Sequence, residues 1–247
     1  MNESKVMTIC IIITVVMTSI SAYLIYDNYL KEEMLDERTA AQTAIHSVVQ
    51  IECSSEGYLP TAGTGFIIAQ DGVKVLTNAH VIAYESSPDE LTTYENITCK
   101  FFNSPDKYLL EVISYDIDSD LSVLKFADES INVNPLKLGN SGKLQYGQEA
   151  YTIGNGMNYG LSAAKGCISV PLVKVVSNGF ERLVIQTDLY IHGGNSGGPL
   201  LNENNEVIGM MSFRITGSNG SIVQGISYAV PSNIIAEYLR GMPAESI

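Results

Sequence analysis

The stretch Gly193-Gly194-Asn195-Ser196-Gly197-Gly198-Pro199-Leu200 sets a serine in a glycine-rich turn just before an apolar strand. A serine hydroxyl is a poor nucleophile unless a base takes its proton and donors receive the charge that develops on the substrate oxygen. Glycines on both sides let the backbone bend sharply, so that N–H groups can point at one place beside the hydroxyl. A tight turn that merely contains a serine is the alternative interpretation.

Two further segments favour the catalytic interpretation. Thr77-Asn78-Ala79-His80-Val81-Ile82 follows a predicted hairpin whose turn is Asp71-Gly72, and this puts His80 at the end of a strand. Asp118-Ser119-Asp120 immediately precedes an apolar run. Hydroxyl, imidazole and carboxylate are the three parts of acyl-transfer catalysis, so the three segments together predict a catalytic site.

The choice of base is narrow, because the sequence holds 3 histidines. His46 lies in the approach to the first predicted strand and is expected to be structural. His192 lies on the same turn as Ser196 and is expected to line a pocket. His80 is therefore the predicted base.

These segments resemble the trypsin-like serine peptidases, most closely the HtrA/Deg branch. Matching pieces run along nearly the whole chain after about residue 45: 63–68 (GTGFII), 77–82 (TNAHVI), 120–125 (DLSVLK), 153–155 (IGN), 166–169 (GCIS), 186–188 (QTD), 194–200 (GNSGGPL) and 225–232 (GISYAVPS). The order His80, Asp120, Ser196 is the trypsin-like order. In such enzymes the serine attacks, the histidine carries the proton and the aspartate orients the imidazole. The resemblance also implies an oxyanion hole made by the N–H groups of Gly194 and Ser196.

Short β-rich runs divided by turn residues predict an all-β protein after residue 45. The predicted strands are 47–53, 64–69, 73–77, 97–102, 108–115 and 121–126, then 149–154, 160–170, 183–187, 198–202, 206–212 and 224–230. The resemblance implies two six-stranded antiparallel barrels with the site in the cleft between them. A C-terminal helix is expected to follow, with Ser232 as its N-cap and Gly241 as its stop.

Residues 6–26 carry no charge and are long enough to cross a bilayer core of about 30 Å. We predict a single-pass transmembrane anchor with the catalytic domain outside the cytoplasm. A secretory signal cleaved near 19–22 (SISA) is the alternative. The expected domains are 1–27 (tail and anchor), 28–45 (juxtamembrane helix or stalk), 46–133 (first barrel) and 134–247 (second barrel and C-terminal helix).

The formal net charge is −13, from 14 Lys plus Arg and 27 Asp plus Glu, and it argues against nucleic-acid binding. The expected partners are protein or peptide substrates and the lipid bilayer, and self-association through 28–44 stays open. We expect no cofactor and no metal. The resemblance implies a role in protein quality control or signalling. A non-catalytic protease-like binding or chaperone module is the alternative function, which the complete set of catalytic residues disfavours.

The substrate pocket is expected to be lined by Tyr190, His192, Ser212, Ile226, Ser227 and Tyr228. Tyr190 stands where a relative that cuts after Lys or Arg carries aspartate, so a preference for basic residues is not expected. The largest of the expected lining residues are apolar or aromatic and suggest a small or medium apolar preference, and His192 leaves a glutamyl preference open. Asn195 replaces an aspartate of the secreted digestive relatives, which argues against activation by cutting. HtrA proteins usually carry a PDZ domain, and none is expected before the chain ends at Ile247.

Of the 4 cysteines, Cys10 lies in the predicted anchor, and none is spaced as in a zinc site. In the implied barrel the first strand closes the sheet against the fourth. Cys53 and Cys99 then become neighbours and candidates for a disulfide. Two buried free thiols are the alternative, because Cys167 would be left over.

Overall fold

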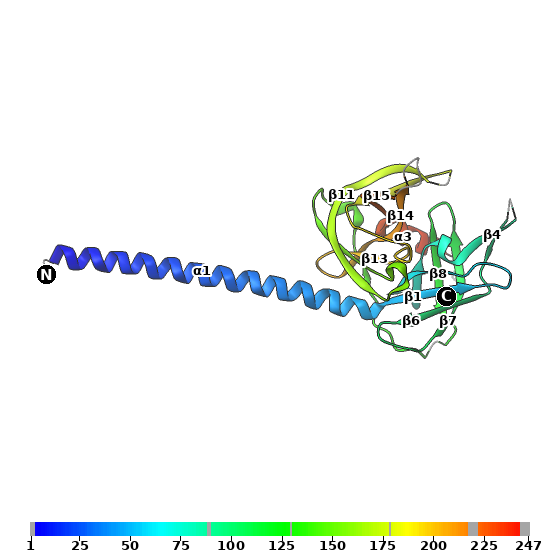
Figure 1. Ribbon diagram of the computed structural model, residues 1–247, viewed down its shortest axis with the longest axis horizontal. Coiled ribbons are helices and arrows are strands. Elements are labelled where there is room, and N and C mark those ends of the chain that lie inside the picture. The colour runs from blue at the N-terminus through cyan, green and yellow to red at the C-terminus, as the bar shows by residue number, and fades with distance from the viewer. Residues whose placement is uncertain (1–2, 88–89, 129, 178, 217–221, 243–247) are drawn as a thin grey trace. The chain divides into compact units, whose positions relative to one another are not determined.

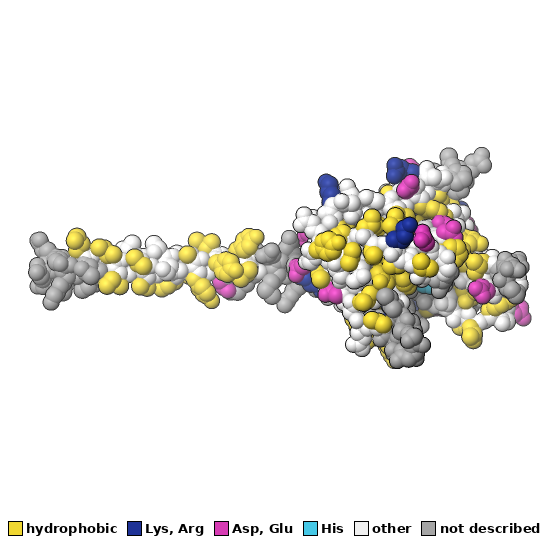
Figure 2. All heavy atoms as spheres, turned by 90° about the horizontal axis from the view of Figure 1, so that it is seen from above, with side chains coloured by type: hydrophobic (Ala, Val, Ile, Leu, Met, Phe, Trp, Pro, Cys, Tyr) yellow, Lys and Arg dark blue, Asp and Glu magenta, His cyan; other side chains and the backbone are white. Residues whose placement is uncertain are grey.

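The computed structural model describes residues 3–87, 90–128, 130–177, 179–216 and 222–242. It divides the chain into two compact units, Met1–Ala40 and Ala41–Ile247. The first unit is formed by helix α1 (Glu3–Ala44), whose last turn belongs to the second unit. Hydrophobic side chains are exposed along α1 (Figure 2), and the span Ile11–Leu30 has a mean hydropathy of 1.4 with none of it buried. By length and composition this span could cross a membrane.

Six antiparallel strands of the second unit close into a barrel in the order β1-β2-β3-β8-β7-β6 (Figure 1). Their bounds are Val48–Ser54 (β1), Thr61–Ala69 (β2), Val73–Thr77 (β3), Asn96–Phe101 (β6), Tyr108–Asp116 (β7) and Leu121–Phe126 (β8). Alternate residues of β1, such as Val49 and Ile51, pack inward on Ile67 and Leu124. The predicted first barrel is confirmed.

A second sheet contains seven strands in the order β13-β10-β11-β12-β15-β14-β9. Because β13 pairs with both β10 and β14, six of them form a ring, and β9 adds to β14 in parallel. Their bounds are Lys137–Leu138 (β9), Glu149–Gly154 (β10), Ser162–Ser177 (β11), Phe180–Thr187 (β12), Pro199–Leu201 (β13), Glu206–Thr216 (β14) and Ile222–Pro231 (β15). Ile185, Leu200 and Met211 are in its core.

One hydrophobic core joins the two barrels. It contains Phe66 and Leu121 of the first barrel, Ile153 and Met210 of the second, and Ile235 of the C-terminal helix α3 (Ser232–Gly241). The short helices are η1 (Ile45–Ser47), α2 (Ala79–Ile82), η2 (Ser141–Lys143) and η3 (Gly156–Asn158). Because the barrels share buried apolar surface, neither could leave the other without exposing it to water.

The structure corrects the predicted elements in several places. A hairpin of β4 (Ala83–Ser87) and β5 (Glu90–Thr93) was not predicted, because its residues are mostly polar. Strand β11 runs past Pro171, which lies at a register shift where no regular ladder bond is needed. Ser232 is not the N-cap of α3: its hydroxyl instead donates to the carbonyl of Gly139 at 2.9 Å, and Pro231 occupies the cap position.

The predicted pairing of strands β1 and β6 is confirmed, but the disulfide between their cysteines is not formed. Both thiols are free and buried. The register places Cys99 opposite Ile51 and Cys53 opposite Ile97, so the cysteines are diagonal neighbours. Diagonal pairs lie about 7–8 Å apart, beyond the usual Cα separation of a disulfide. Burial raises the pKa of each thiol to about 12.

Candidate active site

The segment that carries His80 is a single helical turn. The sequence predicted His80 at a strand end, but β3 stops at Thr77 and His80 lies in helix α2. Asn78 precedes this helix with extended backbone and is buried. Its side-chain amide donates to the carbonyl of Asp120 at 2.9 Å. The helical turn is thereby fixed to the segment that carries the carboxylate.

Asp120 and His80 form a close pair. The imidazole Nδ1 lies 2.9 Å from Oδ1 and 3.0 Å from Oδ2 of Asp120, and the backbone N–H of His80 also donates to Oδ1 at 3.2 Å. Asp120 is 3% exposed, whereas the side chain of His80 is 49% exposed. A buried carboxylate therefore holds one nitrogen of a ring whose other edge is open to solvent.

Ser212 on β14 is the second residue that donates to this carboxylate. Its hydroxyl donates to Oδ2 of Asp120. Burial alone would raise the pKa of Asp120, but the hydrogen bonds from His80 and Ser212 outweigh burial and hold it below its ordinary value. Asp120 is therefore ionised at neutral pH. Ser212 was predicted as a pocket residue, and its contact with the carboxylate is one that sequence reasoning missed.

The turn around Ser196 requires glycine at two positions. Gly194 has φ +97° and Gly197 has φ +84°, in the left-handed region. A Cβ on Gly194 would lie 2.2 Å from the carbonyl oxygen of Asn155. A Cβ on Gly197 would lie 2.1 Å from both Thr64 O and Thr77 Oγ1. The sequence pattern therefore reflects both a backbone conformation and close packing.

Thr64 of the first barrel holds this turn in place. Its hydroxyl donates to the carbonyl of Gly194 at 2.6 Å and accepts from the N–H of Asn155 at 2.9 Å. Its own N–H donates to the carbonyl of Ser196 at 2.8 Å. The sequence marked residues 63–68 as a motif but did not reveal this role.

The backbone of the turn presents two unused donors. The Gly193 carbonyl accepts from the N–H of Met157 at 2.7 Å. Across the same trans peptide the N–H of Gly194 points the opposite way. Within the described part of the chain, the N–H groups of Gly194 and Ser196 have no intramolecular acceptor. These are the two groups predicted as oxyanion donors.

The hydroxyl of Ser196 donates to the backbone carbonyl of Ser212 at 3.0 Å. Among the described residues it makes no hydrogen bond to His80. Ser212 thus contacts the serine through its carbonyl and Asp120 through its hydroxyl. Catalytic hydrogen bonds are often long or absent in free enzymes and tighten when substrate binds, so the present partner of the hydroxyl does not argue against Ser196 as a nucleophile.

The predicted pocket residues fall into two groups. Tyr190 and His192 lie on the loop before Ser196 with ring centroids 4.7 Å apart, and Tyr190 is 48% exposed. Ser227 is buried, and its hydroxyl donates to the carbonyl of Leu189 at 2.9 Å. Tyr228 is buried against Phe213 with centroids 5.1 Å apart, and Ile226 is half-buried. Among the six predicted pocket residues, Tyr190 is thus exposed, His192 and Ile226 are half-buried, and the other three are buried.

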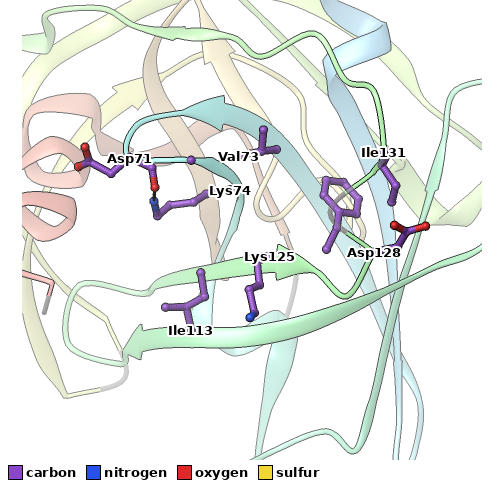
Figure 3. A pocket seen from close by; sticks show the side chains of 9 residues that line it. Asp71, Val73, Lys74, Ile113, Lys125, Asp128 and Ile131 are labelled. Atoms are coloured by element: carbon purple, nitrogen blue, oxygen red, sulfur yellow. Dashed lines mark hydrogen bonds between the residues drawn. The ribbon is translucent and has the colours of Figure 1, made fainter. Parts of the chain in front are cut away.

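A cavity in the first barrel contains a buried lysine, but none of the predicted site residues lines it (Figure 3). Its volume is about 390 Å³, and Lys74, Lys125 and Phe126 are among its lining residues. The Lys74 ammonium donates to the carbonyls of Gln70 and Asp71, each at 2.6 Å. Burial lowers the pKa of Lys74. Because two of the three N–H donors of the ammonium are bound by its own hairpin turn, this lysine stabilises the turn and is a poor candidate for catalysis.

Comparison with known proteins identifies the family. Residues 63–210 match the model of the trypsin-like peptidase domain. The chain belongs to the trypsin-like peptidase family. It is 38% identical over 176 residues to the probable periplasmic serine endoprotease DegP-like of Chlamydia trachomatis, covering 69% of this chain and 31% of that relative. The corresponding Marinomonas protein is 34% identical over 179 residues, covering 72% of this chain and 35% of the relative. This trypsin-like chain thus spans about a third of the length of the curated relatives it matches.

Solved structures place this trypsin-like peptidase in the HtrA branch, as the sequence predicted. Two structures of the HtrA-type protease AlgW with a tripeptide, one of them a variant, superpose with a TM-score of 0.68. They are 25% and 24% identical to this chain, and the match covers 83% of this chain and 62% of each AlgW chain. The two-barrel architecture is therefore that of HtrA-type proteases.

Proposed function

We propose that this protein is a serine endopeptidase that uses Ser196, His80 and Asp120 to hydrolyse peptide bonds. The observation that carries the proposal is the buried, ionised Asp120 bound to His80 Nδ1, in the same site as a serine on a glycine turn with two free N–H donors. Family membership supports the same chemistry.

The proposed reaction begins when Ser196 turns toward His80. The Oγ–H proton passes to Nε2 as Oγ bonds to the substrate carbonyl carbon. The N–H groups of Gly194 and Ser196 stabilise the oxyanion, and one such donor is worth about 100- to 1000-fold in rate. His80 then returns the proton to the departing amine as the C–N bond breaks. Water, activated by His80, hydrolyses the acyl-enzyme.

Asp120 keeps the imidazole in the tautomer that this chemistry needs. Because its carboxylate accepts from Nδ1–H, the lone pair of the neutral ring stays on Nε2. The same negative charge stabilises the imidazolium that forms next. Substrate preference remains a prediction: the largest residues expected to line the pocket are apolar or aromatic and favour a small or medium apolar residue, and His192 leaves a glutamyl preference open.

Purified protein provides the test of the reaction. Ser196→Ala should abolish casein cleavage and fluorophosphonate labelling, with at least about a thousandfold loss of kcat/KM. Asp120→Asn should lower kcat by orders of magnitude while the protein stays folded. If wild-type protein binds peptides but neither cleaves them nor reacts with the probe, the binding-module alternative is correct instead.

We further propose that α1 anchors the peptidase in a membrane, with the second unit outside the cytoplasm. The apolar, exposed span Ile11–Leu30 supports an anchor, and relatives named as periplasmic support the location. Full-length protein should stay in the pellet after carbonate extraction. Release by carbonate, or an amino terminus mapped just after 19–22, would point to a cleaved signal. Self-association through 28–44 stays a prediction from the sequence, and a role in quality control stays a prediction from the resemblance.

A further inference from the structure

Arg182 on β12 of the second barrel reaches across to the first barrel. Its Nε donates to the carbonyl of Asp118 at 2.8 Å, and Nη2 donates to the carbonyl of Ile117 at 2.7 Å. These two carbonyls lie in the turn between β7 and β8, just ahead of Asp120. A guanidinium presents its donors as a rigid planar fork, so two bonds fix both the position and the orientation of the turn.

The turn needs such support, because Asp120 has an unusual backbone conformation. Its φ of +57° lies in the left-handed region, which residues other than glycine adopt only where their surroundings hold them. The N–H of Asp120 donates to the carbonyl of Ile117 at 3.2 Å. Arg182 and Asp120 therefore share one acceptor. A shift of Arg182 would move the hydrogen bond that sets the direction of Asp120.

The same guanidinium also lies against two aromatic rings. Its central carbon lies 5.6 Å from the ring centroid of Phe180 and 6.0 Å from that of Phe213. Phe213 directly follows Ser212, which donates to Asp120. One side chain thus contacts the turn before the carboxylate and the strand that supplies a donor to that carboxylate.

The contacts of Arg182 indicate a positional role rather than neutralisation of charge. Asp116, Asp118 and Glu181 line a cavity of about 260 Å³ beside it. Among the described residues, however, Arg182 forms no ion pair with a carboxylate. Asp116 instead accepts from the N–H groups of Asp118 and Ser119, at 3.2 and 3.1 Å. The turn is therefore held by Asp116 from within and by Arg182 from the second barrel.

We propose that Arg182 is a positioning residue for the triad, acting through Asp120 by fixing the β7–β8 turn to the second barrel. This inference rests on the proposed peptidase function. It makes the alignment of Asp120 depend on contact between the barrels. The Ser196 turn belongs to the second barrel, so Arg182 ties the nucleophile and the carboxylate to the same framework.

Kinetics of Arg182→Ala on a peptide substrate provide the test. We expect kcat to fall about 10- to 100-fold, the range in which small misplacements affect rate, while KM stays within about twofold. Arg182→Lys, which keeps the charge but loses the fork, should fall between that variant and wild type. Lys174→Ala is the matched control, because it removes only an exposed ion pair with Glu181 at 3.0 Å on the same hairpin. Its kcat should be unchanged.

A double variant separates positioning from general loss of structure. If Arg182 acts through Asp120, adding R182A to D120N should change kcat by less than about twofold, because coupled residues are not additive. An equal fractional loss in both backgrounds would overturn the proposal, as would a kcat of R182A within twofold of wild type. If R182A does not fold, the same comparison is made with R182K, alone and combined with D120N. A kcat of R182K equal to that of wild type would then refute the proposal. An inactive wild-type protein would instead refute the proposed function.

Discussion

Gly197 gives the most direct test of how the turn around Ser196 is built. Alanine at this position meets two separate penalties. The left-handed backbone at φ +84° costs an L-residue about 1–2 kcal/mol. The added Cβ would lie 2.1 Å from Thr64 O and Thr77 Oγ1, two buried atoms that are already hydrogen-bonded to each other at 2.7 Å. Forcing a methyl group into such packing costs about 1–3 kcal/mol more.

Gly72 provides a matched control in the same unit. Its φ is +101°, and nothing lies within 4 Å of a Cβ placed on it. Gly72→Ala should therefore carry only the backbone penalty of about 1–2 kcal/mol, whereas Gly197→Ala should lose about 2–5 kcal/mol. Urea unfolding of both variants, with equal slopes, gives the comparison. Gly197→Ala should also lose peptidase activity, and Gly72→Ala should retain it. If Gly197→Ala is no less stable than Gly72→Ala, the close packing described for this turn is wrong.

Three further outcomes are expected. Ser212→Ala keeps the backbone carbonyl that accepts from the Ser196 hydroxyl but removes the hydroxyl that donates to Asp120. It should lower the free energy of unfolding by about 1.5–3 kcal/mol at pH 7. Because the folded pKa of Asp120 lies below its unfolded value, its ionised form stabilises the fold above about pH 4 and this is lost as pH falls through the folded pKa. The Ser212→Ala deficit should therefore shrink in urea titrations below about pH 4, and an equal deficit at both pH values would contradict the assignment. Thr64→Val should reduce kcat and the free energy of unfolding, because it leaves the Gly194 carbonyl and the Asn155 N–H without their hydrogen-bond partner. Thr64→Ser keeps the hydroxyl and should restore kcat and stability. Cys53 and Cys99 should resist a thiol reagent in the native state and react fully after unfolding without reductant; a thiol count two short would indicate a disulfide.

Local patterns in the sequence predicted the strands and the three site segments, because alternating apolar residues and glycine turns are local signals, whereas the closure of the strands into two barrels was implied by the family resemblance. The turn around Ser196 is an example, since Gly194 and Gly197 are required by its backbone. The contacts that hold the site were not predictable in this way. Thr64, Ser212 and Arg182 act on residues 130, 92 and 64 positions away, respectively. No local pattern carries that information.

The predicted disulfide between Cys53 and Cys99 was wrong for a related reason. Strand order made Cys53 and Cys99 neighbours, but strand register decides which residues stand opposite each other. Register depends on the packing of a whole face, so a two-residue offset is invisible in the spacing. The same limit applies to Ser232, whose hydroxyl has a partner, Gly139, that a local capping rule does not foresee.

The bond between Thr64 and the Gly194 carbonyl, which spans 130 positions, has a consequence for when activity can arise. A chain made from its amino terminus has Thr64, His80 and Asp120 long before residues 194–212 exist. Folds dominated by such distant pairings form slowly, because the chain loses the entropy of loop closure before the distant residues make their stabilising contacts. The site formed by these residues therefore cannot be completed until synthesis has passed Ser212. If the amino-terminal helix directs the growing chain to a membrane, as proposed, the proposed peptidase site would still be incomplete while residues 194–212 are being made.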